Sequence, residues 1–98
     1  MMNIPEPVLF EWDKGNASKN LHKHEVADSE CEETFTDEHK RLYKDVFHSQ
    51  REDRYILIGK TNAGRLLNVV FTKRKDMIRV ISARDLNKKE RRFYEEAT

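Results

Sequence analysis

Arginine side chains in the last third of the chain have the clearest chemical potential. Arg79 interrupts an apolar run at residues 77–82, and Arg84 follows shortly after it. A guanidinium stays ionised and donates two parallel hydrogen bonds to phosphate oxygens, so both residues are candidate catalytic groups. Because a charge in an apolar strand is costly to bury alone, Arg79 needs either an anionic ligand or an internal carboxylate, Glu11 or Glu52. The alternative for Arg84 is a bond to carbonyl groups or to an acid near the terminal helix.

Other residues could support the same chemistry. Arg65 lies beside a predicted hairpin turn and is either a phosphate clamp or a solvated turn residue. Lys23 and His24 end a predicted helix, where the lysine either neutralises phosphate or favours the helix C-terminus. Histidine in general suits acid–base work near neutral pH, but His24 shares a helix face with Ala17 and Leu21, so we predict that it is packed. The candidate catalytic residues are therefore Arg79, Arg84, Arg65 and Lys23.

The bases are concentrated in the C-terminal part of the chain. Residues 1–38 hold ten acids and three bases, whereas residues 39–98 hold sixteen bases and eight acids, so the total charge of +1 hides a split of −7 and +8. This asymmetry indicates a polyanionic partner. The alternatives are a solvated surface with internal charge pairing and a seat for an acidic protein segment. The last bases along the chain are Lys88, Lys89, Arg91 and Arg92.

Length and composition exclude several classes of protein. The chain has 98 residues, 37% apolar and 38% charged, which fits one domain over residues 1–98 with a modest core. No apolar run approaches the ~18 residues of a membrane span, and Met1–Glu6 lacks the features of a secretory signal. A single cysteine, Cys31, cannot form an internal disulfide, so we expect a cytoplasmic protein. Without an HExxH motif or a Gly-rich phosphate loop, we expect no metal and no cofactor.

Three helices are predicted from periodicity and capping residues. The first occupies residues 13–24, with Asp13 as its N-cap. The second begins at a capping box formed by Ser29 and Glu32, although Asp28 competes for the cap. The third lies over residues 87–96 and also begins with a capping box. The inward stripe of the second helix consists of Cys31, Thr34 and Phe35.

Five strands complete a predicted α+β fold, over residues 8–12, 42–46, 54–59, 66–72 and 77–82. Short connections between the later strands predict a meander of antiparallel strands. Leu67, Val69 and Phe71 share one face of their strand, and that face must be covered by helices. The opposite face carries polar groups among aliphatic ones and could stay open.

The two central arginines cannot meet on a regular strand. Side chains alternate along a strand, so Arg79 and Arg84 would point to opposite faces. Both can reach one site only if the chain bends or bulges near residues 82–83. We predict an irregularity there.

A series of short motifs lies in order over residues 8–96. They are Phe10-Glu11-Trp12-Asp13, Lys19-Asn20-Leu21, Lys23-His24, Phe35 with Asp37, Arg54 ahead of Ile58-Gly59, Gly64-Arg65-Leu66-Leu67, Arg79-Val80-Ile81-Ser82-Ala83-Arg84, and Glu90-Arg91-Arg92 with Tyr94-Glu95. Each motif is weak alone, but together they resemble the BrnT toxins of bacterial type II toxin–antitoxin systems. The family usually has glycine after the Lys-His pair, where this chain has Glu25.

The resemblance implies a RelE-like antiparallel meander sheet with two N-terminal helices and one C-terminal helix. It implies a ribonuclease that blocks translation and is neutralised by a BrnA-type ribbon-helix-helix antitoxin. The complex, expected as a heterotetramer, would bind operator DNA through the antitoxin. We expect metal-independent RNA cleavage, with RNA-binding residues Lys88, Lys89, Arg91, Arg92 and Arg54. The alternatives are a non-catalytic nucleic-acid-binding module and a protein-interaction module.

Overall fold

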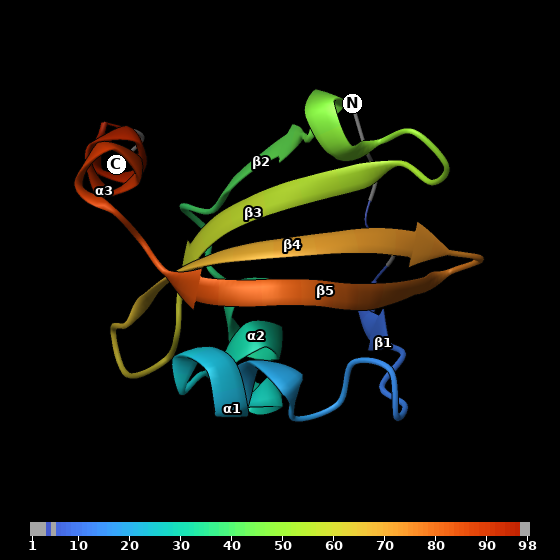
Figure 1. The fold of residues 1–98 in the computed structure, drawn as a ribbon. Coiled ribbons are helices and arrows are strands. Elements are labelled where there is room, and N and C mark those ends of the chain that lie inside the picture. The colour runs from blue at the N-terminus through green and yellow to red at the C-terminus, as the bar shows by residue number, and fades with distance from the viewer. Residues whose placement is uncertain (1–3, 5, 97–98) are drawn as a thin grey trace.

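The computed structural model describes residue 4 and residues 6–96, and Figure 1 shows how its elements are arranged. The elements in chain order are β1 (Leu9–Phe10), α1 (Lys19–His24), α2 (Asp28–Thr34), β2 (Arg41–Lys44), the 3-10 helix η1 (Val46–His48), β3 (Arg54–Lys60), β4 (Leu66–Arg74), β5 (Met77–Asp85) and α3 (Lys88–Glu95). The expectation about a secretory signal concerns a segment that lies mostly outside the described residues.

The predicted α+β class is confirmed, with one correction to the sheet. The strand order is β1-β5-β4-β3-β2, and β2 to β5 form the expected antiparallel meander. β1 instead joins the outer edge of β5 in parallel, through the pairs Leu9↔Met77 and Phe10↔Ile78. The sheet is therefore mixed, because the long connection through both N-terminal helices lets β1 run in the same direction as β5.

The core lies between one face of the sheet and the N-terminal helices. Leu67, Val69 and Phe71 are fully buried on that face, as predicted. The inward stripe of α2 is also confirmed, and Phe35 packs edge-on against Phe71 with ring centroids 5.0 Å apart. Both α1 and α2 lie below the sheet in Figure 1, whereas α3 stands at one end of the opposite side. Most of the second face therefore carries no helix.

The predicted inner face of α1 is wrong. Leu21 is 48% exposed and His24 is also exposed, whereas the buried residues of this region are Asn16 and Asn20. α1 begins only at Lys19, after a series of turns. Polar side chains are preferred inside because β1 pairs with β5 over only two residues, and the backbone of β5 beyond that point needs other hydrogen-bond partners.

The predicted start of α2 is also wrong. Ser29 lies inside the helix, and Ala27 occupies the N-cap position. Glu30 supplies the reciprocal contact, because its Oε1 accepts a hydrogen bond from the backbone N–H of Ala27 at 2.9 Å. Glu32 is used elsewhere and accepts a hydrogen bond from the Trp12 indole at 2.7 Å. The capping box predicted for α3 is confirmed, since Asn87 and Glu90 bond each other's backbone N–H.

Candidate functional site

A β-bulge places Arg79 and Arg84 on the same face of the sheet. Val70 pairs with Ser82 and Phe71 with Val80, so Ile81 is the extra residue of β5. The extra residue shifts the alternation of side chains by one, so Arg79 and Arg84 both lie on the face opposite α1 and α2. We call it the helix-free face, because most of it carries no helix. The predicted irregularity thus exists, one residue before its expected place. The two arginines pair with positions four residues apart on β4, which separates their backbones by roughly 13 Å.

Two buried asparagines hold the backbone around the bulge. Asn20 Oδ1 accepts a hydrogen bond from the Ala83 N–H at 3.0 Å, and Asn16 Nδ2 donates to the Val80 carbonyl at 3.1 Å. The Ala83 N–H and the Val80 carbonyl lie on either side of Ile81, and β1 is too short to form hydrogen bonds with them. An orphaned buried donor or acceptor is costly, so the asparagine amides stabilise the bulge that orients the arginines.

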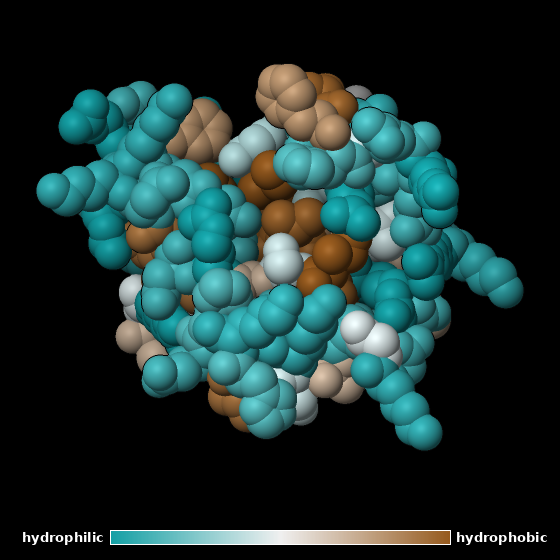
Figure 2. Space-filling model, in the orientation of Figure 1, coloured by the Kyte–Doolittle hydropathy of each residue, from teal (hydrophilic) through white to brown (hydrophobic). Residues whose placement is uncertain are grey.

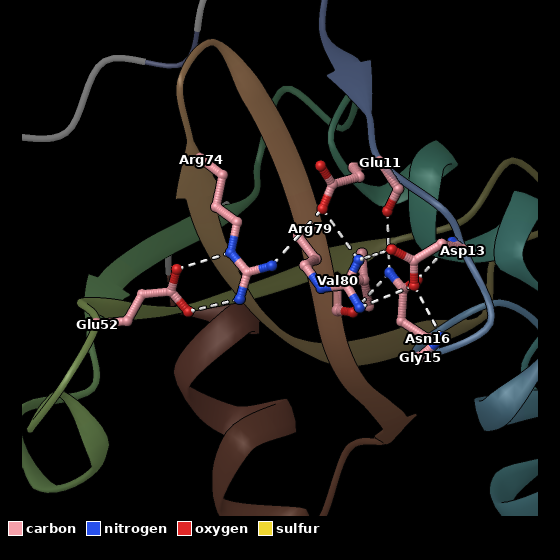
Figure 3. A network of polar contacts seen from close by, with 8 residues as sticks. All are labelled: Glu11, Asp13, Gly15, Asn16, Glu52, Arg74, Arg79 and Val80. Carbon is pink, nitrogen blue, oxygen red and sulfur yellow. Dashed lines mark hydrogen bonds and ion pairs between the residues drawn. The ribbon is translucent and has the colours of Figure 1, made fainter.

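Arg79 is the centre of a carboxylate network at the β1 edge of the sheet (Figure 3). Its Nη1 donates to Glu11 Oε1 at 3.0 Å and to Asp13 Oδ2 at 2.9 Å, and its Nη2 donates to Asp13 Oδ1 at 3.0 Å. The Arg79 side chain is 14% exposed. The carboxylate alternative is therefore the arrangement found, with Glu11 as expected and Asp13 in addition. Glu52 pairs instead with Arg74, at 2.8 Å.

Arg84 occupies the other end of the same face, beside α3. Its Nη1 and Nη2 donate to the two oxygens of Glu90, both at 2.8 Å, and Nη1 also donates to the Asp85 carbonyl at 3.0 Å. Asn68 Nδ2 donates to the same carboxylate at 2.8 Å. The hydrogen bond from Arg84, with that from the Asn87 N–H, lowers the pKa of Glu90 below its ordinary value of 4.5. The Arg84 side chain is nevertheless 44% exposed.

Arg65 connects the end of α1 with the end of β5. Its Nε and Nη2 bond the Asp85 carboxylate at 2.7 and 3.0 Å, and its Nη1 reaches Glu30 at 3.3 Å. The carbonyls of His24 and Glu25 accept its remaining bonds, at 3.2 and 2.7 Å. The hydrogen bond from Arg65 lowers the pKa of Asp85 below 3.8. Arg65 is thus neither a solvated turn residue nor a group with spare donors.

The three arginines differ in how many of their N–H groups remain available to a ligand. A guanidinium has five such groups. Within the described part of the chain, all five of Arg65 are used, by Asp85, Glu30 and the carbonyls at the end of α1. Arg79 and Arg84 each leave their Nε–H and one Nη2–H without a bonded acceptor there. Arg84 is the more exposed of the two and is the best placed to bind an anion.

The structure gathers some candidate residues and separates others. Lys23 and His24 end α1 beside Arg65, and Arg65 and Arg84 both bond residue 85. However, α1 lies on one side of the sheet, whereas the Arg84 side chain lies on the opposite face beside α3. Arg79 belongs to a different network, at the other end of the face. Asp85 was not singled out from the sequence, and only its place directly after Arg84 could have pointed to it.

The candidate RNA-binding residues are cations that form no ion pair with a described acidic group. Lys88, Lys89, Arg91 and Arg92 are exposed on α3, and Arg54 is half-buried on β3. None of these five makes an ion pair with a residue in the described ranges. Arg91 lies close enough to Asp85 for its charge to contribute to the lowered pKa of that carboxyl, after the larger effect of Arg65.

Two broader findings concern ligands and membranes. Within residue 4 and residues 6–96, no three His, Cys, Asp or Glu side chains are grouped so that they could hold a metal ion. None of the helices described is long and apolar enough to cross a membrane.

A small α+β fold with arginines and unpaired cations on a partly uncovered sheet face has the features expected of a polyanion-binding protein. A family model described as "Ribonuclease toxin, BrnT, of type II toxin-antitoxin system" matches residues 12–90. Because this match covers most of the chain, the protein belongs to the BrnT family of ribonuclease toxins, which confirms the resemblance seen in its motifs. A search of curated proteins finds no match.

Proposed function

We propose that this protein is an endoribonuclease that cleaves RNA without a metal ion and so inhibits translation. The observation that carries this proposal is the family match over residues 12–90. In the proposal, residues 1–98 act as one RelE-like, cytoplasmic toxin domain. A BrnA-type ribbon-helix-helix antitoxin neutralises it in a heterotetramer that binds operator DNA through the antitoxin.

Metal-independent cleavage sets three requirements. The ribose 2′-hydroxyl must be aligned with the adjacent phosphate, a group must accept its proton, and the charge of the pentacoordinate phosphorane must be stabilised. Arginine suits the last requirement, because it remains cationic and presents donors in a fixed geometry.

Arg84 is the proposed ligand of the phosphorane oxygens. Its unused Nε–H and Nη2–H, its exposure and its place on the helix-free face support this role. The bidentate bond to Glu90 fixes the guanidinium plane, and Asn68 fixes Glu90 in turn. A donor that is held in place before the substrate arrives needs little reorganisation during the reaction.

The end of α1 supplies the other proposed groups. His24 is exposed there, on the α1 side of the sheet, and we assign it the proton transfer that the sequence pattern had argued against. This assignment requires the RNA to pass around the end of β5, because Arg84 lies on the opposite face. Lys23 is exposed beside it and would neutralise substrate phosphate. Arg65 acts as a positioning residue, because its bonds to the His24 and Glu25 carbonyls fix the end of the helix relative to β5.

The remaining candidates are proposed to hold the RNA backbone. Arg79 keeps two donors on the same face, and Arg54 lies on β3 at the same end of that face, because Arg54 and Arg79 both pair with Thr72 of β4. The cations of α3 would bind phosphates beside Arg84. Because these contacts are electrostatic, RNA binding should weaken strongly as salt is raised.

A non-catalytic nucleic-acid-binding module is the second candidate. It is favoured by one observation, which is that Arg65, Arg79 and Arg84 are all bonded to carboxylates in the absence of a ligand. Such a module would hold RNA through its free cations without cutting it.

Incubation of the purified protein with RNA in EDTA separates these possibilities. We expect discrete RNA ends from the wild type, and their loss in Arg84→Ala at a temperature where circular dichroism shows the variant to be folded. Lys19→Ala is a control, because Lys19 is exposed at the start of α1, which lies on the other side of the sheet. Retarded but intact RNA would reject catalysis and favour the binding module.

A further inference from the structure

The helix-free face of the sheet has an apolar centre that the proposed chemistry does not use. Ile56 on β3, Val70 on β4 and Ile81 on β5 are only partly buried there. Figure 2 shows apolar residues gathered in a hollow between α3 and the segment that carries η1. We call this hollow the sheet groove and define it by Tyr43, Ile56, Ile58, Val70, Ile81 and Phe93. Partly exposed aliphatic groups gathered in one hollow are typical of an interaction surface.

Exposed aromatic side chains stand on both walls of the sheet groove. On the α3 wall, Phe93 is 38% exposed and borders a hollow of about 400 Å³ shared with Tyr43 and Ile58. On the η1 wall, Phe47 is 83% exposed and borders a second hollow of about 400 Å³. Phe93 also packs against the Tyr43 ring and the Arg41 guanidinium, whereas Phe47 is too exposed to contribute much to the fold. Aromatic anchors of this kind are enriched at protein interfaces.

The dimensions of the sheet groove suit a single α-helix. Along β3, the walls are marked by Ile58 near α3 and by Arg54 near η1, a separation of four residues or roughly 13 Å. Across the strands, β2 to β5 cover three spacings, or roughly 14 Å. A helix with its side chains is about 10–12 Å wide, so one helix fits between the walls.

The charges beside the sheet groove select an acidic occupant. The acids that line the two hollows are already paired, Glu90 with Arg84 and Glu52 with Arg74. By contrast, three cations beside the two hollows make no ion pair with any residue that the structure describes; they are Lys89, Arg51 and Arg54. A partner with carboxylates on either side of an apolar stripe would complement this pattern.

A protein occupant fits the sheet groove better than RNA does. Sheets that bind single-stranded RNA present aromatic rings on which bases stack. The floor here is aliphatic, formed by Ile56, Val70 and Ile81 beside the exposed Ser82, and the aromatic rings stand on the walls rather than on the floor. Such a floor suits the apolar face of an amphipathic helix, whose anchors recur at every third or fourth residue.

We propose that the sheet groove binds an acidic amphipathic helix of the antitoxin, an inference that rests on the proposed function. The helix would lie across β3 to β5 with its apolar face on Ile56, Val70 and Ile81. Its carboxylates would meet Lys89 on one wall and Arg51 and Arg54 on the other. Because Arg84 and Glu90 lie at the α3 end of the same face, the bound helix would cover Arg84 and exclude RNA from it.

The test measures binding of the purified chain to the protein encoded by the neighbouring reading frame, by titration calorimetry. Phe47→Ser and Phe93→Ser should each weaken binding by at least about tenfold, as expected for aromatic anchors. Phe47 is so exposed that its substitution leaves the fold intact, which keeps the test valid if Phe93→Ser loses stability. Leu21→Ser is the matched control, because Leu21 is 48% exposed on α1, on the other side of the sheet.

The outcomes are distinct. Weaker binding by both groove variants, with the Leu21→Ser variant unchanged and RNA cleavage retained, supports the proposal. Equal binding by all variants overturns it and leaves the toxin function intact. If the groove variants lose RNA cleavage but keep the antitoxin, the sheet groove is part of the RNA site and the proposal is wrong. No binding by a wild type that cleaves RNA overturns the antitoxin assignment alone, and the loss of both activities overturns the proposed function as well.

Discussion

The guanidinium of Arg79 and the carboxylate of Asp13 lie edge to edge, with Nη1–Oδ2 and Nη2–Oδ1 distances of 2.9 and 3.0 Å. This bidentate pair connects β5 to the chain directly after β1, two segments more than 60 residues apart in sequence. Gly15 completes the arrangement, because its N–H donates to Asp13 Oδ1 at 2.8 Å. The pair therefore fastens the short parallel strand to the edge of the sheet.

Gly15→Ala should loosen this pair without changing any charge. A Cβ at position 15 would lie 2.7 Å from Arg79 Nη2, so the guanidinium must move away from Asp13. We expect a lower melting temperature than that of the wild type, measured by circular dichroism. Gly64→Ala is unsuitable as a control because Gly64 has a φ of +94°, and Ser29→Ala, an exposed change within α2, serves instead. A melting temperature equal to the wild type would show that the pair does not stabilise β1.

Acid should destabilise the protein through its lowered carboxyl pKa values. Hydrogen bonds from Arg79, Arg74, Arg65 and Arg84 lower the pKa values of their partner carboxyls, which are Asp13, Glu52, Asp85 and Glu90. The unfolded chain then binds protons at a higher pH than the folded chain does. The stabilisation is present above the ordinary values of 3.8 and 4.5 and is lost as the pH falls through the lowered folded values.

This acid effect can be measured as the melting temperature between pH 7 and pH 2.5. We expect a plateau near neutrality and a fall that begins as the pH approaches the ordinary carboxyl values. Asp13→Asn removes one of these carboxyls, so its curve should fall less steeply than that of the wild type. Parallel curves for the two proteins would contradict the role of Asp13.

Asn20→Ala should destabilise the protein by removing a hydrogen bond to the backbone of β5. The substitution leaves the Ala83 N–H without its acceptor, and Asn20 is only 2% exposed, so water cannot easily replace the amide. An unsatisfied buried donor costs about 1–3 kcal/mol of the free energy of unfolding. Urea denaturation measures the loss, and Asn62→Ala, at an exposed turn position, is the control.

The same variant also tests the link between the bulge and the site. If Asn20 serves only general stability, the folded fraction of Asn20→Ala should cleave RNA at the wild-type rate. We expect instead a lower rate at temperatures where the variant remains folded, because the bulge sets the orientation of Arg84 relative to Arg79.

Arg84→Ala should lower the rate constant of RNA cleavage by about 10²–10³-fold, the usual effect of removing a donor that stabilises the transition state. Arg84→Lys should recover only part of the loss, since an ammonium cannot present the planar pair of donors. Single-turnover cleavage assays give the rate constants. Arg65→Ala should act mainly on the melting temperature, because every Arg65 donor is bonded within the protein. A larger kinetic effect for Arg65 than for Arg84 would reverse the two assignments.

The sequence predicted the structure correctly where a pattern depends on interactions between residues close together in the chain. The alternation of Leu67, Val69 and Phe71 in β4 identified the buried face, and the Asn87–Glu90 capping box identified the start of α3. The parity of Arg79 and Arg84 also predicted a bend or bulge if both were to reach one site, and β5 has a bulge at Ile81. The sequence misled in α1, where three apolar or aromatic positions at helical spacing were taken as the inner face, although Asn16 and Asn20 are the buried residues.

By itself, the sequence determined the α+β class, the antiparallel meander, the basic C-terminal part and the family. Each of these depends on patterns among residues close together in the chain, or on short motifs that occur in a fixed order. Only the tertiary structure decided which carboxylate neutralises which arginine, that β1 runs parallel to β5, and that amides rather than apolar groups face inward from α1. The reason is that partners such as Arg79 and Asp13 meet across the sheet edge, and no periodicity in the chain records which distant segment lies at an edge with unpaired backbone groups.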